Sequence, residues 1–452
     1  MSKKKPLHCY QAMQGVSITS DGRARPCCVV SPRFDLYTYT TRYDDEKHKN
    51  LAPPHRKYEI ADTINDFVNA DSLKQVRQQL RNGEWPSICE SCKIMEESNI
   101  KSYRQSHNEM NSEHIDYDFK KMKSDGTVDV TAIEYLDITL GNQCNLKCRS
   151  CNPYLSHNWI EESKNVEFEE TKWNLFSYSH IERTSNDPWY KYSFDNDYFK
   201  EVIPNLKGIN FLGGEPLVVK EHYEWLEKIV ESGHAKNIHL TYNTNGTTIP
   251  DHLLDLWKNF KSINIGLSVD AYGDLAHYVR YPSKWKNIER NSQKLADYAQ
   301  HQGSLTAHLH TTISLLNIHA LPELLRWNMQ NFKTRNFYSS ELGYNIGFQK
   351  LTPSFNIVTE PTYLNVCHLP DEEKEIVNAM LDEQYEFYTN TDLVPDWAKD
   401  PVIDILNLKN YVNQPREEKQ WQAFLTNTKR SDKFRGINIL DYIPWMQKYL
   451  DK

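Results

Sequence analysis

The stretch IEYLDITLGNQCNLKCRSC, residues 133–151, joins a strand-like apolar run to three closely spaced cysteines. The run at 133–140 is rich in apolar and β-branched residues, which predicts a buried strand. Cys144, Cys148 and Cys151 then follow on one short loop. Thiols on one loop can face one centre, but a structural soft-metal site usually takes four ligands. What completes the site therefore decides what kind of protein this is.

The composition of the 452-residue chain is that of a globular protein, with 39% hydrophobic and 12% aromatic residues. This length predicts two or three domains, or one large α/β domain with additions. A net charge of -8 and short basic clusters disfavour nucleic-acid binding. The chain has neither a signal-peptide core nor an apolar run of about 18 residues, so we expect a cytoplasmic protein without a membrane partner.

Strand-like and helical segments alternate after the cysteine loop. The further predicted strands are 208–212, 237–242, 262–267, 305–313 and 345–350. This alternation predicts an α/β fold with a parallel sheet and right-handed crossovers. Six units are fewer than the eight of a closed TIM barrel, so we expect a partial (β/α)6 barrel with its chemistry at the carboxyl ends of the strands. The sequence after the last predicted strand indicates a helical C-terminal tail, with helices at 372–388, 402–412, 416–425 and 439–450.

Two metal centres are compatible with the C-x3-C-x2-C spacing of the loop. Structural zinc would need a fourth ligand, for which His157 is the nearest candidate. A cubane iron-sulfur cluster held by three thiolates instead leaves one iron open to an external ligand, as a catalytic cluster requires. The spacing alone does not distinguish structural zinc from an iron-sulfur cluster.

Residues 144–151, CNLKCRSC, resemble the signature of the radical S-adenosylmethionine (radical SAM) superfamily, and their place after the first barrel strand is also that of the family. The second strand ends in FLGGEP, residues 211–216, which resembles the Gly-Gly-Glu-Pro segment of the family. The resemblance implies that the open iron binds SAM and that the segment Gly213, Gly214, Glu215 and Pro216 holds its amino group.

Later strand ends extend the resemblance with YNTNG at 242–246 and LSVD at 267–270. The cofactor contacts that it implies are Asn243, Asn245, Ser268, Asp270, Arg280 and Asn317. One position departs from the family pattern, because Ser150 stands where an aromatic residue usually contacts adenine. We therefore expect the adenine packing to come from another residue, such as Tyr242 or Phe211.

The N-terminal region carries two further pairs of cysteines. The sequence from Val16 to Arg25 predicts a β-hairpin with a turn at Asp21-Gly22, which brings Cys9 and Cys27 to one end. Cys89 and Cys92 form a CxxC, and without other information four such cysteines predict a zinc ribbon.

This region resembles the SPASM and Twitch auxiliary-cluster modules of radical SAM proteins, in a layout that places the module ahead of the barrel. The resemblance implies a second 4Fe-4S cluster on Cys9, Cys27, Cys89 and Cys92, with Cys28 as the alternative to Cys27. The expected domains are an auxiliary module at 1–125, a radical SAM barrel at 126–360 and a helical extension at 361–452.

The resemblance also implies an activity: reductive cleavage of SAM to a 5'-deoxyadenosyl radical, which takes a hydrogen atom from a substrate. The expected substrate is a peptide or protein side chain, and the alternative is a sugar, nucleotide or other small metabolite. The expected reductant is a flavodoxin or ferredoxin. Cys367 is expected to be a small buried residue, with hydrogen-atom donation as its alternative role. The alternative from another functional class is a noncatalytic binding protein whose fold is stabilised by structural zinc.

Overall fold

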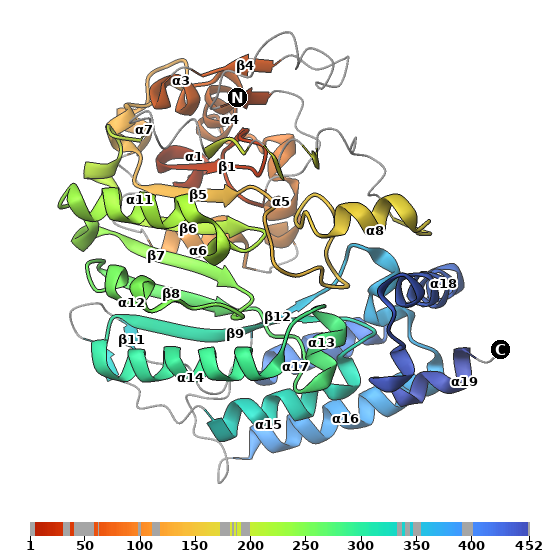
Figure 1. Ribbon diagram of the computed structural model, residues 1–452. Coiled ribbons are helices and arrows are strands. Elements are labelled where there is room, and N and C mark those ends of the chain that lie inside the picture. Colours follow the sequence, from red (N-terminus) through yellow and green to blue (C-terminus); the bar gives the residue numbers. More distant parts are fainter. Residues whose placement is uncertain are drawn as a thin grey trace.

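The computed structural model describes residues 5–29, 37–39, 58–61, 63–97, 101–110, 118–171, 181–182, 185–186, 188–190, 199–331, 337–339, 344–346, 354–390 and 401–450. Within these ranges, no helix is both long enough and apolar enough to span a membrane. An open sheet runs through the molecule with helices packed along it (Figure 1).

The main sheet has eight strands in the order β12-β9-β8-β7-β6-β5-β1-β2. Neighbouring strands from β12 to β1 are parallel, and β1 pairs antiparallel with β2. The bounds are β1 Gly15–Ile18, β2 Ala24–Arg25, β5 Tyr135–Leu140, β6 Gly208–Gly213, β7 His239–Thr244, β8 Ser262–Leu267, β9 Leu305–Ile313 and β12 Ser354–Ile357. Because β12 and β2 lie at opposite edges, the sheet is not closed, which confirms the predicted partial barrel.

The two faces of the sheet differ in polarity. On β5, Leu136, Ile138 and Leu140 are fully buried in the main core. Alternate residues of a strand point to the opposite face. One row of this other, inner face consists of Asp137, Asn210, Thr241, Asn264 and Thr306, which lie side by side in register. The barrel therefore packs its helices on an apolar outer face and leaves a polar inner face.

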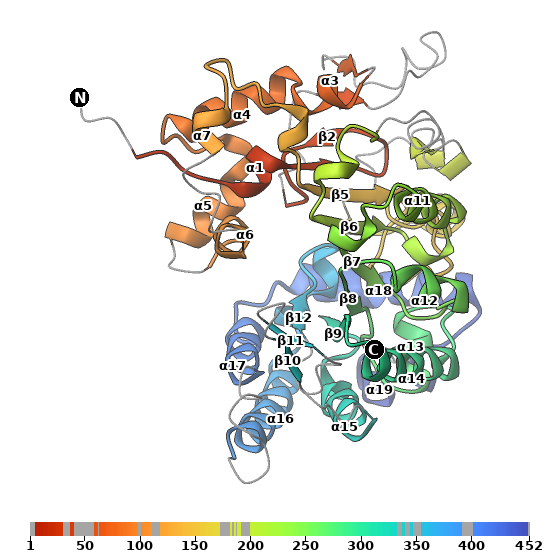
Figure 2. The same ribbon diagram turned by 90° about the vertical axis from the view of Figure 1, so that its left-hand side faces the viewer.

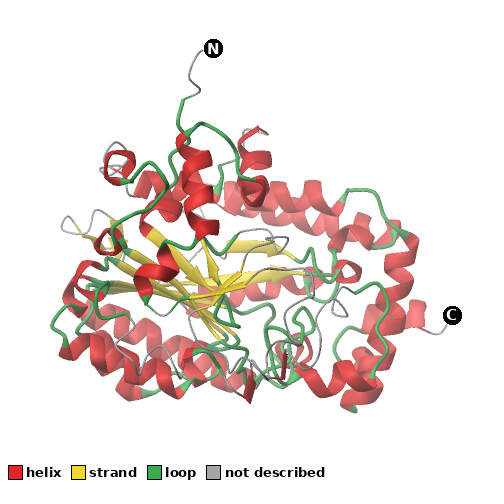
Figure 3. Ribbon diagram, turned by 90° about the horizontal axis from the view of Figure 1, so that it is seen from above, coloured by secondary structure: helices red, strands yellow, loops and turns green. Residues whose placement is uncertain are grey.

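Helices between the strands cover the outer face (Figure 3). They include α11 Lys220–Glu231, α12 Asp251–Trp257, α14 Trp285–Gln302 and α15 Leu321–Asn331. Two shorter helices, α8 Trp159–Asn165 and α13 Asp274–Val279, lie beyond the carboxyl ends of the strands (Figure 1). Trp225 of α11 packs edge-on against Phe211 of β6, with ring centroids 5.6 Å apart. Contacts of this kind join helices and strands into one continuous core.

The N-terminal elements lie at one end of the sheet (Figure 2). They are α1 Tyr10–Gln14, α3 Ile64–Val68, α4 Asp71–Arg81, α5 Glu90–Glu97, α6 Tyr103–Met110 and α7 Asp118–Lys121, with β3 Tyr37–Tyr39 and β4 Tyr58–Ile60 in a small parallel pair. The predicted hairpin is present as β1 and β2. Its first strand also pairs with β5, from Gly15 beside Tyr135 to Ile18 beside Ile138, so the hairpin extends the barrel sheet.

The sixth predicted strand was misplaced. Residues 344–346 form β11, Tyr344–Ile346, which pairs antiparallel with β10, Phe337–Ser339, in a separate sheet, while 347–350 lie outside the described residues. The sixth barrel strand is β12, paired in parallel with β9. Both runs are short and only partly apolar, so periodicity could not distinguish between them.

The C-terminal helices lie at the other end of the sheet (Figure 2). They are α16 Asp371–Thr389, α17 Pro401–Val412, α18 Glu418–Arg435 and α19 Gln447–Leu450. Helix α18 continues to Arg435, well beyond the predicted end at residue 425, whereas the last predicted helix breaks into short turns before α19. These helices share a second core with residues that follow β9 and β12.

Candidate cofactor and metal sites

The three-cysteine loop follows β5 at its carboxyl end, where parallel strands place their functional loops. Four consecutive side chains hold its backbone: Ser156 Oγ donates to Leu146 O (2.6 Å), His157 Nδ1 accepts from Cys144 N (3.2 Å), Asn158 Nδ2 donates to Cys144 O (2.6 Å) and Trp159 Nε1 donates to Cys148 O (2.9 Å). These bonds hold the loop backbone in place. His157 bonds to the loop backbone and is not among the residues that line the adjoining pocket.

A pocket of about 410 Å³ opens beside this loop. Its lining includes Cys144, Cys148, Cys151, Gly213, Gly214, Glu215, Asn243, Asn245, Ser268 and Arg280. The fold thus gathers the carboxyl ends of β6, β7 and β8 around the three thiols. The lining also contains residues that the sequence did not single out, namely Leu146, Leu155, Thr312 and the segment Asn356–Glu360.

The two glycines of the predicted SAM segment lie against the backbone of the cysteine loop. A Cβ on Gly214 would lie 2.2 Å from the carbonyl oxygen of Gln143, and Gly213 has a φ of 124°. Glu215 N donates to the same Gln143 oxygen at 2.9 Å. These glycines therefore allow two backbone segments to approach closely, because no side chain stands between them.

The carboxylate of Glu215 is 2% exposed and lies on a polar wall of the pocket. It accepts from Thr244 Oγ1 (2.7 Å), Asn245 N (2.6 Å) and Leu217 N (3.2 Å). Burial raises the pKa of Glu215, and these hydrogen bonds oppose the rise because they favour the charged form. The bonds orient the carboxylate, which in this position could pair with an ammonium group.

Arg280 reaches the pocket from the end of α13, and Asp270 orients it. Asp270 contacts its guanidinium at two points, 2.7 Å from Nε and 2.9 Å from Nη2. Asn317 lies behind this pair, where its amide nitrogen donates to Asp270 O and Thr312 O, both at 2.8 Å. Asp270, Asn317 and Pro216 are not among the pocket-lining residues, so they contact its wall from behind.

Ser150 lines the pocket, but the aromatic residues expected to replace its missing ring do not. Phe211 and Tyr242 are fully buried and stack on each other, with centroids 5.2 Å apart. Tyr242 also bonds through its hydroxyl to His222 Nε2 at 3.0 Å. Both belong to the main core on the outer face of the sheet, together with Ile209 of β6 and Leu240 of β7. The expectation that either contacts adenine is wrong, and the apolar surface near the loop comes from residues such as Ile357 and Val358.

Free thiolate chemistry is disfavoured at the three thiols. Burial raises the pKa of Cys144, Cys148 and Cys151. Metal coordination reverses this tendency, because the thiolate is the form that binds and the metal supplies the compensating charge. The loop and its polar wall therefore suit a cluster with an open iron and a ligand carrying amino and carboxylate groups.

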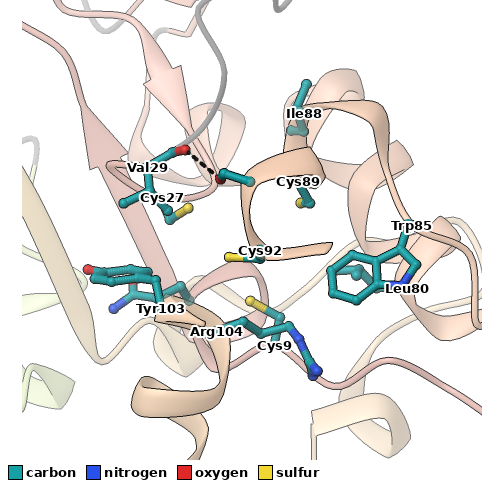
Figure 4. Close-up of a pocket in the computed structure, with 12 residues that line it drawn as sticks. Cys9, Cys27, Val29, Leu80, Trp85, Ile88, Cys89, Cys92, Tyr103 and Arg104 are labelled. Carbon is teal, nitrogen blue, oxygen red and sulfur yellow. Dashed lines mark hydrogen bonds between the residues drawn. The ribbon is translucent and has the colours of Figure 1, made fainter. Parts of the chain in front are cut away.

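The four N-terminal cysteines predicted as a second ligand set line one cavity. Figure 4 shows the sulfur atoms of Cys9, Cys27, Cys89 and Cys92 around a common space. Hairpin β1–β2 carries the chain to Cys27, while Cys89 and Cys92 come from the first turns around α5. Burial raises the pKa of Cys9 to about 11 and of Cys89 to about 12.

Arg104 is the cation of this second cavity. Its guanidinium contacts Glu96 through Nε (2.9 Å) and Nη2 (2.5 Å), and its charge lowers the pKa of both Cys9 and Cys89 against the larger effect of burial. Cys28 is not among the lining residues; its thiol instead donates to Tyr103 Oη at 3.3 Å. This arrangement favours Cys27 over Cys28 as the ligand.

The remaining candidate, Cys367, lies in the C-terminal core on the short turn Val366–His368. It is 7% exposed, lies 3.6 Å from His368 Nδ1 and does not line the pocket of the cysteine loop. Across the described part of the chain, no three Cys, His, Asp or Glu side chains meet closely enough to hold a single metal ion.

Comparison with known proteins identifies the barrel. Residues 138–327 match the model of the radical SAM superfamily, and this range contains the cysteine loop and most of the pocket. Residues 138–327 are therefore similar to the radical SAM domain, a family that implies one 4Fe-4S cluster and SAM as cofactors.

Two characterised relatives are similar over part of the chain. A GTP 3',8-cyclase from Campylobacter lari is 28% identical over 172 residues, which are 38% of this chain and 44% of the cyclase. A GTP 3',8-cyclase from Desulforamulus reducens is 22% identical over 223 residues, 44% of this chain and 60% of the relative. In both cases the match covers less than two thirds of the relative.

Among solved structures, similarity is found to anSMEcpe with bound AdoMet and a Cp18Cys peptide, with a TM-score of 0.35, 16% identity and coverage of 58% of this chain and 62% of the other. Streptococcus suis SuiB bound to the precursor peptide SuiA gives a TM-score of 0.30 and 11% identity, covering 68% and 62% of the two chains.

Proposed function

We propose that this protein is an enzyme that cleaves SAM reductively and uses the product radical to take a hydrogen atom from a peptide or protein side chain. The observation that carries the proposal is the convergence of three thiols, Glu215 and Arg280 in one pocket. When bound, the cluster and SAM together supply the electron and the 5'-deoxyadenosyl radical.

The residues of the pocket have distinct roles in this proposal. Cys144, Cys148 and Cys151 hold the cluster and leave one iron open. Glu215 pairs with the amino group of SAM, because its carboxylate already has a fixed orientation. Arg280 and Ser268 contact the carboxylate and ribose, and Asp270 holds the guanidinium of Arg280 in place. Orientation and exclusion of water are then the main contributions of the protein.

The polar inner face of the barrel supports a substrate without a large negative charge. Strands β5 to β9 and β12 contain neither lysine nor arginine, and the inner face carries neutral groups such as Asn264 and Thr306. Burial lowers the pKa of His308 to about 4, so this imidazole is also neutral near pH 7. A triphosphate is usually bound through cations or a metal, whereas amides and hydroxyls suit this surface.

A nucleotide is the second candidate, because both characterised relatives are named GTP 3',8-cyclase. The two substrate classes are distinguished by asking what stimulates 5'-deoxyadenosine formation. If the inner face selects a peptide, millimolar GTP should leave the rate of 5'-deoxyadenosine formation at the level measured without any substrate. A clear increase with GTP, together with a modified nucleotide product, would contradict the peptide assignment.

We further propose a second 4Fe-4S cluster on Cys9, Cys27, Cys89 and Cys92, with a flavodoxin or ferredoxin as the external reductant. The convergence of the four thiols and the cation of Arg104 support this assignment. A fully ligated cluster could accept an electron from the substrate radical or stabilise the module.

The test is anaerobic reconstitution followed by iron analysis and detection of 5'-deoxyadenosine. Two clusters predict about eight irons per chain, by the stoichiometry of 4Fe-4S centres. Replacement of Cys144, Cys148 and Cys151 by Ala should remove half of the iron and all SAM cleavage, and persistent cleavage would overturn the core assignment. Cys28→Ser is the matched control for Cys27→Ser, since only Cys27 lines the second cavity. A colourless protein with zinc and no SAM binding would instead support the noncatalytic alternative.

A further inference from the structure

The C-terminal helix α18 contacts the three-cysteine loop through buried ion pairs, and Figure 1 shows this helix close to α8, which follows the loop. Arg149, the residue after Cys148, pairs with Asp432 of α18 and lies 4.1 Å from the ring centroid of Tyr278. Asp432 also accepts from Tyr278 Oη at 3.0 Å. A residue inside the loop is thereby fixed by a helix almost 300 positions away in sequence.

A second ion-pair set joins the same elements. Lys147, also in the loop, lies 3.1 Å from Glu162 of α8. Glu162 is fully buried and accepts from Arg435 Nε at 2.8 and 3.0 Å, and from Ser431 Oγ at 2.5 Å. Arg435 thus ends α18 beside the helix that holds the loop backbone.

The charges of this network do not balance. Lys147, Arg149 and Arg435 are three cations, whereas Glu162 and Asp432 are two carboxylates. Arg435 is 8% exposed, and its Nη1 and Nη2 have no hydrogen-bond partner among the described residues. A surplus buried cation is costly unless an anion offsets it. Three thiolates on an iron-sulfur cluster would form such an anion next to this network, because Arg435 lies 4.7 Å from the ring centroid of Trp159, whose Nε1 donates to Cys148 O at 2.9 Å.

We infer that Arg435 is a positioning residue of the core cluster: its charge stabilises the anionic reduced state and raises the reduction potential, which makes the C-terminal extension part of the cofactor site. The inference rests on the proposed function, because it assumes the core cluster. The physical basis is that a cation near a redox centre stabilises the form with the additional electron, more strongly in a buried site than in water.

The test measures the midpoint potential of the SAM-responsive EPR signal in reconstituted full-length protein. Arg435→Gln should shift the one-electron equilibrium toward the oxidised cluster by about tenfold, equivalent to about 59 mV. Arg435→Lys should have a midpoint potential close to that of the unmodified protein, because lysine retains the positive charge. The matched control is Arg430→Gln, on the same helix but exposed and paired with Glu169 at 3.3 Å.

An unchanged potential in an iron-loaded Arg435→Gln protein would overturn the inference, and so would an equal shift in Arg435→Lys, which would indicate a packing effect. If Arg435→Gln does not fold, Lys147→Gln removes one charge at the rim of the network, where the side chain is 17% exposed, and should lower the potential in the same direction. An unchanged potential there would also overturn the inference. Absence of any SAM-responsive signal in the unmodified protein would contradict the proposed function itself.

Discussion

Gly214→Ala should disable the core site while the protein remains folded. The added Cβ would lie 2.2 Å from Gln143 O and 2.7 Å from Gln143 C, and Gln143 immediately precedes Cys144. Both neighbours are backbone atoms, so no side chain can rotate away from the methyl group. The clash must move either the Gly-Gly-Glu segment or the start of the cysteine loop.

The displacement needed to restore an ordinary contact is about 1 Å, and overpacking of this kind costs about 1–3 kcal/mol. A stable domain tolerates that loss, but a misplacement of about 1 Å at a reacting centre can reduce the rate about a hundredfold. We therefore expect Gly214→Ala to unfold cooperatively at slightly lower urea concentration and to form 5'-deoxyadenosine about a hundredfold more slowly.

The assay combines iron content, SAM binding by calorimetry and the rate of 5'-deoxyadenosine formation. The control is Gly303→Ala, at the left-handed end of α14, where nothing lies within 4 Å of the new Cβ. That variant bears a backbone strain of about 1–2 kcal/mol without touching the site. Normal iron content and a normal rate in Gly214→Ala would refute the argument that close backbone approach positions the cluster loop.

Three further perturbations test other parts of the structure. Arg77→Met should lower the free energy of unfolding by about 3–5 kcal/mol, because three buried carbonyls lose their donor; urea titration beside Arg81→Met, an exposed position on the same helix, checks this. Asp137 has a pKa raised by burial from 3.8 to about 6, so its carboxyl favours folding below about pH 4 and loses that contribution as pH rises through 6. Asp137→Asn should therefore stabilise the protein by about 3 kcal/mol at pH 7 and by little at pH 3.5, and equal effects at both values would contradict the cause. Asp270→Asn removes the charge-assisted hydrogen bond that orients Arg280, and such a bond typically contributes about 2 kcal/mol. SAM binding should therefore weaken about 30-fold. An unchanged dissociation constant in calorimetry would disprove the orienting role of Asp270.

The order of the strands and the place of the site were predictable from the sequence. Alternation of strands with helical segments is a local pattern, and five of the six predicted strands occur where expected. In a parallel sheet all carboxyl ends lie at one edge, so Cys144, Glu215, Asn245 and Ser268 had to meet once their strands were adjacent. Local sequence and topology together were sufficient to predict that these residues lie in one pocket.

Side-chain direction was harder to predict. Tyr242 and Phe211 belong to the same strand ends as pocket residues, yet they point into the core, because a shift of one residue along a strand exchanges the two faces. The position of the sixth barrel strand, β12, was likewise ambiguous between two short, partly apolar runs. The same ambiguity applied to the segment Asn356–Glu360 that lines the pocket. Asn317 supports the wall from behind rather than lining the pocket.

By itself, the sequence determined the barrel class, the grouping of three thiols on one loop and the edge of the sheet at which that loop lies, since these follow from local periodicity and residue spacing. Only the tertiary structure decided that β1 extends the barrel sheet, that Asp432 pairs with Arg149 of the cysteine loop and that Arg435 pairs with Glu162 of α8. Those contacts join residues more than 100 positions apart, and no local pattern encodes which distant charge a buried arginine will meet. Their cause is burial, because a charge removed from water is tolerated only where the fold supplies its partner.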